Sequence, residues 1–344
     1  MTSERQLVAD IIRNFADQGI LETYKIRPEK FARFEDGKVK EFYHPDVYKY
    51  SDELIANFPH LSKIDVNGIP WRKIPNSIGE LENLEILRVR NAELNKIPIE
   101  LADLPRLQVL DLAGNKISEI PDDLGRINLQ MLDLSKNNIK FIPDSIAMMQ
   151  QLHTLGLSSN QLEEIPEAIL HIPAVRTLGI DFNLIDYLPS NIEKLQHLDQ
   201  LGCIQNIHLQ NPNELLHLRK LSWLSFSPEQ VPQDIHHLRN LRFLVIEDMR
   251  NTELPPTICE MEKLLYLRIT NSRLRTLPEC IYQLPNLRFL LVPNNIIHKL
   301  SPSIGACQQL QKLDLSNNNI EKLPPTIDRL KEVEIILDGN PILH

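Results

Sequence analysis

A pattern of leucines that recurs along most of the chain constrains the fold more than any other feature. From Leu61 onward the motif L-x-x-L-x-L-x-x-N-x-L-x-x-[IL]-P-x-x-[IL]-x-x-L repeats, mostly at intervals of 23 residues. Successive units begin at Leu61, Leu84, Leu107, Leu129, Leu152, Val175, Leu198, Leu221, Leu241, Leu264, Leu287 and Leu310. A unit this short cannot bury its own leucines, so it must stack on neighbours of the same kind. We therefore expect about twelve repeats and a partial terminal unit over residues 54–344.

Three positions of the unit predict its local structure. The x-L-x-L stretch alternates with period two, which indicates a strand whose leucines point inward and whose neighbours face solvent. The asparagine at the ninth position, as in Asn115 and Asn137, is expected to turn inward and satisfy backbone groups of adjacent units. The proline at the fifteenth position, as in Pro121, fixes φ at the start of a short return segment.

These units resemble the leucine-rich repeat family in its 23-residue LPxxI form. They are similar to intracellular Ras-scaffold repeats, to plant Ras-group-related repeats and to bacterial leucine-rich repeat effectors. The resemblance implies an α/β solenoid curved like a horseshoe. Its parallel sheet would line the concave face, and short helices or 3-10 turns would line the convex face.

Residues 1–53 lack the repeat and predict a small α+β cap. Ser3 to Gln18 has the spacing of an amphipathic helix. The segment 31–42 places Asp36-Gly37 between two alternating stretches, which indicates a hairpin. Repeat arrays need a cover for the apolar edge of their first unit, and we expect this segment to supply it. The alternative is a separate recognition module.

Composition and charge narrow the classes of function. The net charge of −9 argues against nucleic acid as a partner. No stretch approaches the length of a membrane span, and the first residues do not resemble a signal peptide, so we expect no membrane insertion and a cytoplasmic protein, or one exported without a classical signal. The four cysteines form no CxxC pair and are expected to be reduced thiols. Cys203 and Cys307 fall on core positions, whereas Cys259 and Cys280 lie near the convex side.

No motif for catalysis, phosphate binding or zinc binding is present. We therefore expect no catalytic residues, no metal site and no cofactor.

The exposed strand positions predict a binding surface instead. At the third position of four consecutive units lies what we call the aromatic row, which consists of Trp223, Phe243, Tyr266 and Phe289. At the fifth position, Val245, Arg268 and Leu291 lie beside it. Aromatic rings with an arginine are the composition of binding hot spots. The alternative is that the rings stack on one another and only stiffen the sheet.

Three glycines, Gly156, Gly179 and Gly202, occupy the fifth position of the units before the aromatic row. Such a stretch could seat an extended peptide or a partner helix, or it could be a place where the repeat tolerates small residues. Asp111, Asp133 and Asp314, at the same position of other units, are interpreted as part of the repeat consensus.

The sequence thus predicts a non-enzymatic protein-interaction module or scaffold that binds a protein partner on its concave face. One alternative is a bacterial effector that acts on host proteins. Others are an adaptor for a ubiquitin ligase or signalling enzyme, and a carbohydrate-binding protein that uses the rings. Because the last repeat has little cover, we expect either a monomer or an end-to-end dimer through the C-terminal repeat.

Overall fold

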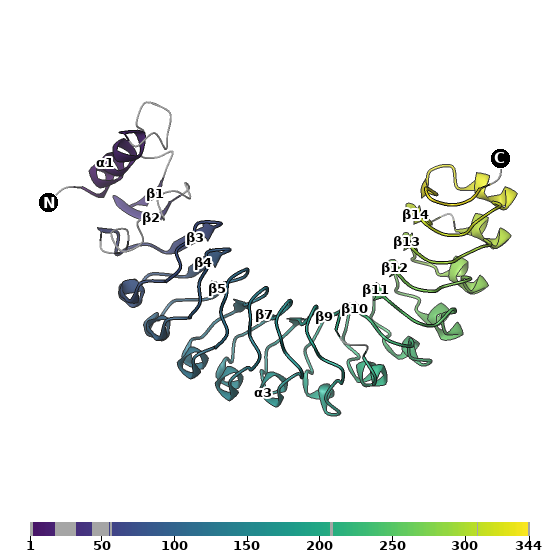
Figure 1. Cartoon of the computed structure of the whole chain (residues 1–344), viewed down its shortest axis with the longest axis horizontal. Helices are drawn as coiled ribbons and strands as arrows, with labels where there is room; N and C mark the ends of the chain where they lie inside the picture. Colours follow the sequence, from purple (N-terminus) through teal and green to yellow (C-terminus); the bar gives the residue numbers. More distant parts are fainter. Residues whose placement is uncertain are drawn as a thin grey trace. The chain divides into compact units, whose positions relative to one another are not determined.

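In the computed structural model, the described residues are 3–17, 32–42, 55, 57–206, 209–307 and 309–342, with the backbone alone described for 11–17. The chain forms two compact units. The first comprises residues 1–161 and 166–175, and the second comprises residues 162–165 and 176–344. In each unit the strands line one face, which we call the strand face, and the short helical turns line the opposite face (Figure 1).

The first unit contains helix α1 (Glu4–Asp17), the antiparallel hairpin β1 (Ala32–Glu35) and β2 (Lys38–Phe42), and a parallel sheet. The parallel strands are β3 (Lys63–Asn67), β4 (Ile86–Arg90), β5 (Val109–Asp111), β6 (Met131–Asp133) and β7 (Thr154–Gly156). The turns are η3 (Asn76–Glu80), η4 (Ile99–Asp103), η5 (Asp122–Arg126), η6 (Asp144–Met148) and the short helix α3 (Glu167–Leu170). Within this unit the consecutive strands from β3 to β7 pair in parallel, as the stacking of identical repeats requires.

The second unit repeats this arrangement with more strands. They are β8 (Thr177–Gly179), β9 (Gln200–Cys203), β10 (Trp223–Phe226), β11 (Phe243–Glu247), β12 (Tyr266–Thr270), β13 (Phe289–Leu291), β14 (Lys312–Asp314) and β15 (Glu334–Ile336). Its 3-10 turns are η7 (Ile192–Lys194), η8 (Pro212–His217), η9 (Ile235–His237), η10 (Pro256–Glu260), η11 (Glu279–Gln283), η12 (Pro302–Ala306) and η13 (Pro325–Arg329). The predicted leucine-rich repeat solenoid, with a parallel sheet on one face and mostly 3-10 turns on the other, is confirmed.

The repeat leucines build the core, as predicted. Leu87, Leu110 and Leu132 of successive strands are completely buried, and burial of a leucine contributes about 1.5–3 kcal/mol. Prolines start most of the turns: Pro121 precedes η5 with φ −69° and ψ 142°. The pyrrolidine ring holds this φ, so the extended strand-to-turn segment stops at the same place in the repeats that have this proline.

The asparagines join adjacent repeats, also as predicted. Asn115 Oδ1 accepts hydrogen bonds from the backbone N–H groups of Ala92 and Leu94, each at 3.0 Å. Its Nδ2 donates to the carbonyl oxygens of Val89 in the preceding repeat and Leu112 in its own repeat. One buried amide therefore satisfies four backbone groups that have no partner in the hydrogen-bond ladder between the strands.

Five repeats lack this asparagine, and the residues in its place are Ile69, Ala92, Glu229, Met249 and Ser272. Met249 and Ser272 belong to consecutive repeats of the second unit, and both are buried. Ser272 Oγ accepts from the Met249 N–H at 3.0 Å and donates to the Thr270 carbonyl. The serine thus replaces only part of the asparagine network at the joint between these repeats.

The N-terminal elements pack on the first repeat. The predicted helix and the hairpin around Asp36-Gly37 are both present. Ser62 N donates to the Lys40 carbonyl at 3.0 Å, and the Phe42 and Phe58 rings lie 5.0 Å apart in an edge-on arrangement. These contacts join the hairpin to the repeat that begins at Leu61, and the predicted role of the segment as a cap stays a prediction.

Candidate functional site

The aromatic row lies on the strand face of the second unit. Parallel pairing places Trp223 opposite Phe243, Phe243 opposite Tyr266 and Tyr266 opposite Phe289. The ring centroids of Phe243 and Tyr266 are 6.1 Å apart, and those of Tyr266 and Phe289 are 6.0 Å apart. Both pairs are tilted and lie in the range of favourable ring contacts. Phe243 is 38% exposed and the other three residues are half-buried, so the row offers apolar surface to solvent.

Trp223 departs from the predicted continuous stack of four rings. It is in register with Phe243, but within the aromatic row, all of whose residues are described, the ring pairs join only Phe243, Tyr266 and Phe289. The tryptophan therefore lies at the end of a stack of three rings. It neighbours Gln200 of β9 on its other side.

A second row runs parallel to the rings. Val245, Arg268 and Leu291 are in register on β11, β12 and β13, and all three are half-buried. The Nε atom of Arg268 is buried and has no hydrogen-bond partner among the described residues. Its guanidinium forms no ion pair with a described carboxylate. The predicted site residues of the second unit thus form one patch of apolar side chains around a single positive charge.

The glycines have a local structural reason. A Cβ atom at Gly156 would lie 2.6 Å from Asp133 Oδ1, and one at Gly202 would lie 2.4 Å from Asp181 Oδ2. Gly179 pairs with Gly202 in the sheet of the second unit. Carboxylates of the preceding repeats therefore occupy the space beside Gly156 and Gly202, and neither glycine opens a groove for a peptide.

The aspartates at the fifth position support the repeat itself, as the consensus interpretation predicts. Asp111, Asp133 and Asp314 each accept a hydrogen bond from the backbone N–H two residues later, at 2.9–3.1 Å. Burial raises the pKa of Asp111, and the neighbouring Asp133 raises it further, against the N–H of Ala113 and the charge of Arg90.

Sequence reasoning missed a cluster of charges on the strand face of the first unit. Asp65 contacts Arg90 at 2.8 Å and Arg88 at 3.4 Å, and Arg90 lies 3.7 Å from Asp111. Lys63 forms an ion pair with Glu41 of the hairpin at 2.6 Å. Arg88 and Arg90 follow the strand alternation, which was the available signal.

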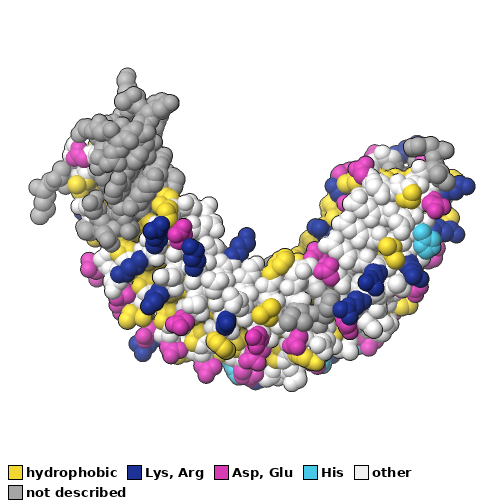
Figure 2. Space-filling model, viewed as in Figure 1, with side chains coloured by type: hydrophobic (Ala, Val, Ile, Leu, Met, Phe, Trp, Pro, Cys, Tyr) yellow, Lys and Arg dark blue, Asp and Glu magenta, His cyan; other side chains and the backbone are white. Residues whose placement is uncertain are grey.

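Sequence reasoning also missed a group of exposed apolar side chains in the second unit. Phe182 is 52% exposed, Leu184 44% and Tyr187 53%. On the face seen in Figure 2, hydrophobic side chains lie scattered between lysine, arginine and acidic side chains. A group of three in one repeat is therefore notable.

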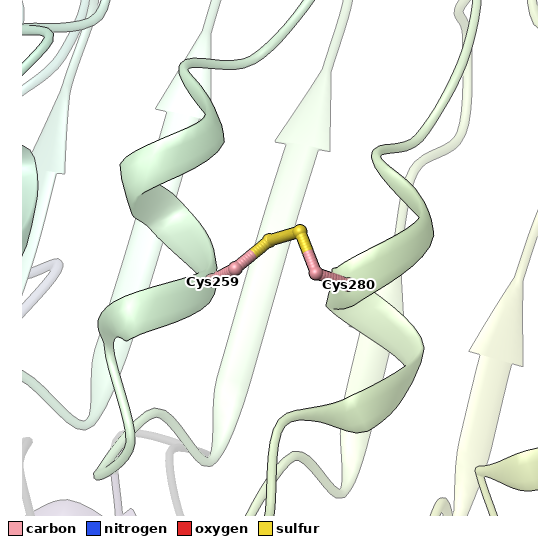
Figure 3. Close-up of a disulfide and its surroundings, with 2 residues drawn as sticks. All are labelled: Cys259 and Cys280. Carbon is pink, nitrogen blue, oxygen red and sulfur yellow. A yellow bond between two sulfur atoms is a disulfide. The ribbon is translucent and has the colours of Figure 1, made fainter.

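The expectation that all four cysteines are reduced is wrong for one pair. Cys259 and Cys280 form a disulfide between η10 and η11, with their Cα atoms 5.6 Å apart (Figure 3). Cys259 lies four residues after Pro255 and Cys280 lies two residues after Pro278. Because these are different positions of the repeat, one side chain faces the following turn and the other faces the preceding turn. Cys203 and Cys307 are free and buried, as predicted for core residues.

The described residues contain no group of His, Cys, Asp and Glu side chains that could hold a metal ion. Within the same residues, no helix has the length and apolar character needed to cross a membrane.

Comparison with known proteins identifies the repeats. Three family models match the chain: a leucine-rich repeat region at residues 200–286, a leucine rich repeat model at 127–185, and a single-repeat model at 106–127 and 309–330. No curated protein sequence is similar enough to this chain to count as a match.

Solved structures agree with the family models. A leucine-rich repeat protein of Leptospira interrogans is 28% identical with a TM-score of 0.70, over 84% of this chain and 87% of that one. An internalin of Listeria monocytogenes is 22% identical with a TM-score of 0.70, over 86% and 84%. The functional domain of InlJ, also from Listeria monocytogenes, is 15% identical with a TM-score of 0.62, over 90% and 63%. The periodic leucines, the asparagine network and these matches together place the chain in the leucine-rich repeat family.

Proposed function

We propose that this chain is a non-enzymatic protein-binding module that holds a protein partner on the strand face of its second unit. The observation that carries the proposal is the patch formed by the aromatic row with Val245, Arg268 and Leu291. Leucine-rich repeats are a general scaffold for protein interaction, and the patch supplies a specific place for it. Binding there would bury aromatic surface that is now in contact with water.

The chemistry of the patch matches that of interface hot spots. Large rings contribute apolar area at a low cost in conformational entropy, and an arginine beside them supplies directional hydrogen bonds. Arg268 has a buried Nε without a hydrogen-bond partner among the described residues. A carboxylate of the partner could accept two parallel hydrogen bonds from this guanidinium. We therefore propose that the partner presents an apolar surface with an acidic side chain.

The competing interpretation is that the rings only stiffen the sheet around the repeat that begins at Leu221, which spans 20 residues instead of 23. A stacked aromatic pair contributes about 0.5–1.5 kcal/mol beyond its buried area, which is enough for a structural role. The two interpretations differ in what happens when rings are removed: loss of partner binding without unfolding supports the patch, and unfolding supports the structural role.

Affinity capture with paired variants tests the proposal. The bait is the full chain, and the test variant is Trp223→Ala combined with Tyr266→Ala. Gln200→Ala is the matched control, because Gln200 is an exposed residue at the same repeat position on the neighbouring strand. We expect a set of proteins that wild type and control retain and the double variant loses, with melting temperatures within about 3 °C, a shift that corresponds to about 1 kcal/mol. Unchanged capture, or an unfolded double variant, would contradict the proposal.

The disulfide bears on the compartment. Structural disulfides persist in oxidising environments and are rare in the reducing cytosol. The Cys259–Cys280 bond therefore supports the exported alternative over a cytoplasmic protein. Thiols trapped by acid quenching of intact native cells and then alkylated under denaturing conditions test this: an exported protein will carry two labelled cysteines, and a cytoplasmic one will carry four. The identity of the captured partner then separates an effector that acts on host proteins from an adaptor of a ligase or signalling enzyme.

A further inference from the structure

The residue at the eighth position of the repeat has a left-handed backbone along the chain. Its φ lies between 51° and 57° wherever it is not glycine, except in the repeat that begins at Leu221, where Pro228 occupies the position. Glycine, asparagine and other polar residues occupy this position: Gly68, Asn91, Gly114, Lys136, Ser159, Gln205, Asp248, Asn271, Asn294 and Asn317. These types suit the conformation, because glycine has no Cβ and asparagine tolerates the region better than other residues.

Phe182 occupies this position with φ 55°. A bulky residue in the left-handed region is an outlier that costs stability. Burial does not compensate the cost, because the side chain is 52% exposed. The backbone is held by neighbours and not by the ring: Phe182 N donates to the Ile204 carbonyl at 2.8 Å, and Asn183 beneath it is buried. The fold itself thus gains nothing that an asparagine would not supply.

Two more exposed apolar side chains follow Phe182 within five residues of the same repeat. Leu184 and Tyr187 are 44% and 53% exposed. The Leu184 backbone N–H donates to the Leu162 carbonyl of the preceding repeat, and the Tyr187 hydroxyl donates to Gln210 Oε1 at 2.7 Å. Both residues are therefore held in place with their apolar parts facing water. We call Phe182, Leu184 and Tyr187 the edge cluster.

The sequence around the edge cluster is acidic. Between Arg176 and Arg219 the sequence has one basic residue, Lys194, and five acidic ones, so the formal charge is 1 − 5 = −4. Asp181 and Asp186 belong to the same repeat as the cluster, and the exposed Glu163 and Glu164 belong to the adjoining strand-to-turn segment of the same unit. On the opposite side, Gln205 donates to the carboxylates of Glu247 and Asp248. An apolar cluster with an acidic rim is complementary to a basic apolar segment.

We propose that the edge cluster is a second binding surface, separate from the aromatic row, and that it takes a basic protein segment with apolar side chains. Phe182 is retained in an unfavourable conformation because its exposed ring binds this segment. The strain, the exposure and the acidic rim are three different observations that this one role explains.

Substitution at Phe182 separates binding from folding, because the two respond in opposite directions. We expect Phe182→Asn to raise the melting temperature by about 2 °C, since it relieves the left-handed strain. The probes are three fluorescein-labelled 12-residue peptides: one alternates lysine and leucine, one lysine and serine, and one glutamate and leucine. Fluorescence anisotropy measures the affinity of the protein for each peptide. Wild type should bind the lysine–leucine peptide at least 10-fold more tightly than the other two, and Phe182→Asn should remove that preference.

Three controls make the outcome specific. Lys136→Asn relieves the same backbone conformation in the first unit and should raise the melting temperature without changing peptide affinity. Leu184→Ser should weaken the binding of the lysine–leucine peptide and leave the melting temperature unchanged. The Trp223→Ala and Tyr266→Ala double variant should bind this peptide as wild type does. A melting temperature lowered by Phe182→Asn, an affinity unchanged by it, or equal binding of the three peptides would overturn the proposal.

Discussion

The carboxylate of Asp133 lies against Gly156, where a Cβ atom would be only 2.6 Å from Asp133 Oδ1. We predict that Gly156→Ala lowers the free energy of unfolding by about 2 kcal/mol, because a methyl group added to a filled space forces its neighbours to move. Urea denaturation followed by circular dichroism measures the change.

A double-mutant cycle with Asp133→Ala isolates this contact. Asp133→Ala alone also costs stability, because the carboxylate accepts a hydrogen bond from the Ser135 N–H at 2.9 Å. The alanine at position 156 should cost little once the carboxylate is gone, so the two effects should not be additive. Additive effects would mean that the glycine is needed for another reason.

Removal of one asparagine amide should destabilise the repeat array strongly. Asn137→Ala deletes the acceptor for the Ile117 N–H and the donor to the carbonyls of Leu112 and Leu134. We expect a loss of about 3 kcal/mol, because buried backbone groups are left without partners. The neighbouring exposed Asn138 is the matched control, and Asn138→Ala should change the free energy of unfolding by less than about 0.5 kcal/mol. Similar values for the two variants would contradict the role of the amide.

The disulfide should make stability depend on a reductant. Cys259 and Cys280 close a loop with a sequence separation of 21, and a loop of this size gives about 3 kcal/mol through the entropy of the unfolded chain. A reductant should therefore lower the unfolding free energy of wild type but not that of Cys259→Ser. An equal response of both proteins would contradict the bond.

Thiol labelling at pH 8 provides an independent check. Burial raises the pKa of the Cys307 thiol to about 11, and burial also raises the pKa of Cys203. Both should react slowly in the folded protein, because the thiolate is the reactive form. Reduction of the disulfide should add two thiols that are labelled faster, those of the half-buried Cys259 and Cys280.

Asp111 should give a pH-dependent contribution to stability. Burial raises its pKa above the ordinary value of 3.8, so the folded chain binds this proton more tightly than the unfolded chain. The resulting stabilisation is complete below pH 3.8 and is lost as the pH rises through the folded value. Asp111→Asn should therefore gain stability relative to wild type between pH 3 and pH 7, as measured by urea denaturation at fixed ionic strength. A difference between the two proteins that does not change with pH would contradict the assignment.

The structural roles of the residues that recur in each repeat were predictable from the sequence, because a residue type that returns at the same position of every repeat indicates a buried position. The periodic leucines and Asn115 indicated the strands and the joints between repeats without any coordinates. The register of the aromatic row followed from the same period. The ring geometry did not, because the side-chain torsions that leave Trp223 outside the stack are set by local packing.

The features that escaped prediction depend on backbone geometry. Cys259 and Cys280 occupy different repeat positions, so their approach requires the path of two 3-10 turns. The carboxylate beside Gly202 is a contact between repeats that no local pattern reports. Phe182 looks like an ordinary aromatic until its φ is known.

The partial replacement of asparagine by Ser272 has a consequence for how the second unit comes apart. A pull along the array loads the hydrogen bonds between repeats, and at the joint between the repeats of Met249 and Ser272 a serine hydroxyl stands in place of the asparagine amide. The Cys259–Cys280 bond crosses that same joint on the turn face. The covalent link thus reinforces a joint that lacks the asparagine network, and Phe243 and Tyr266 lie on the two repeats that it ties together.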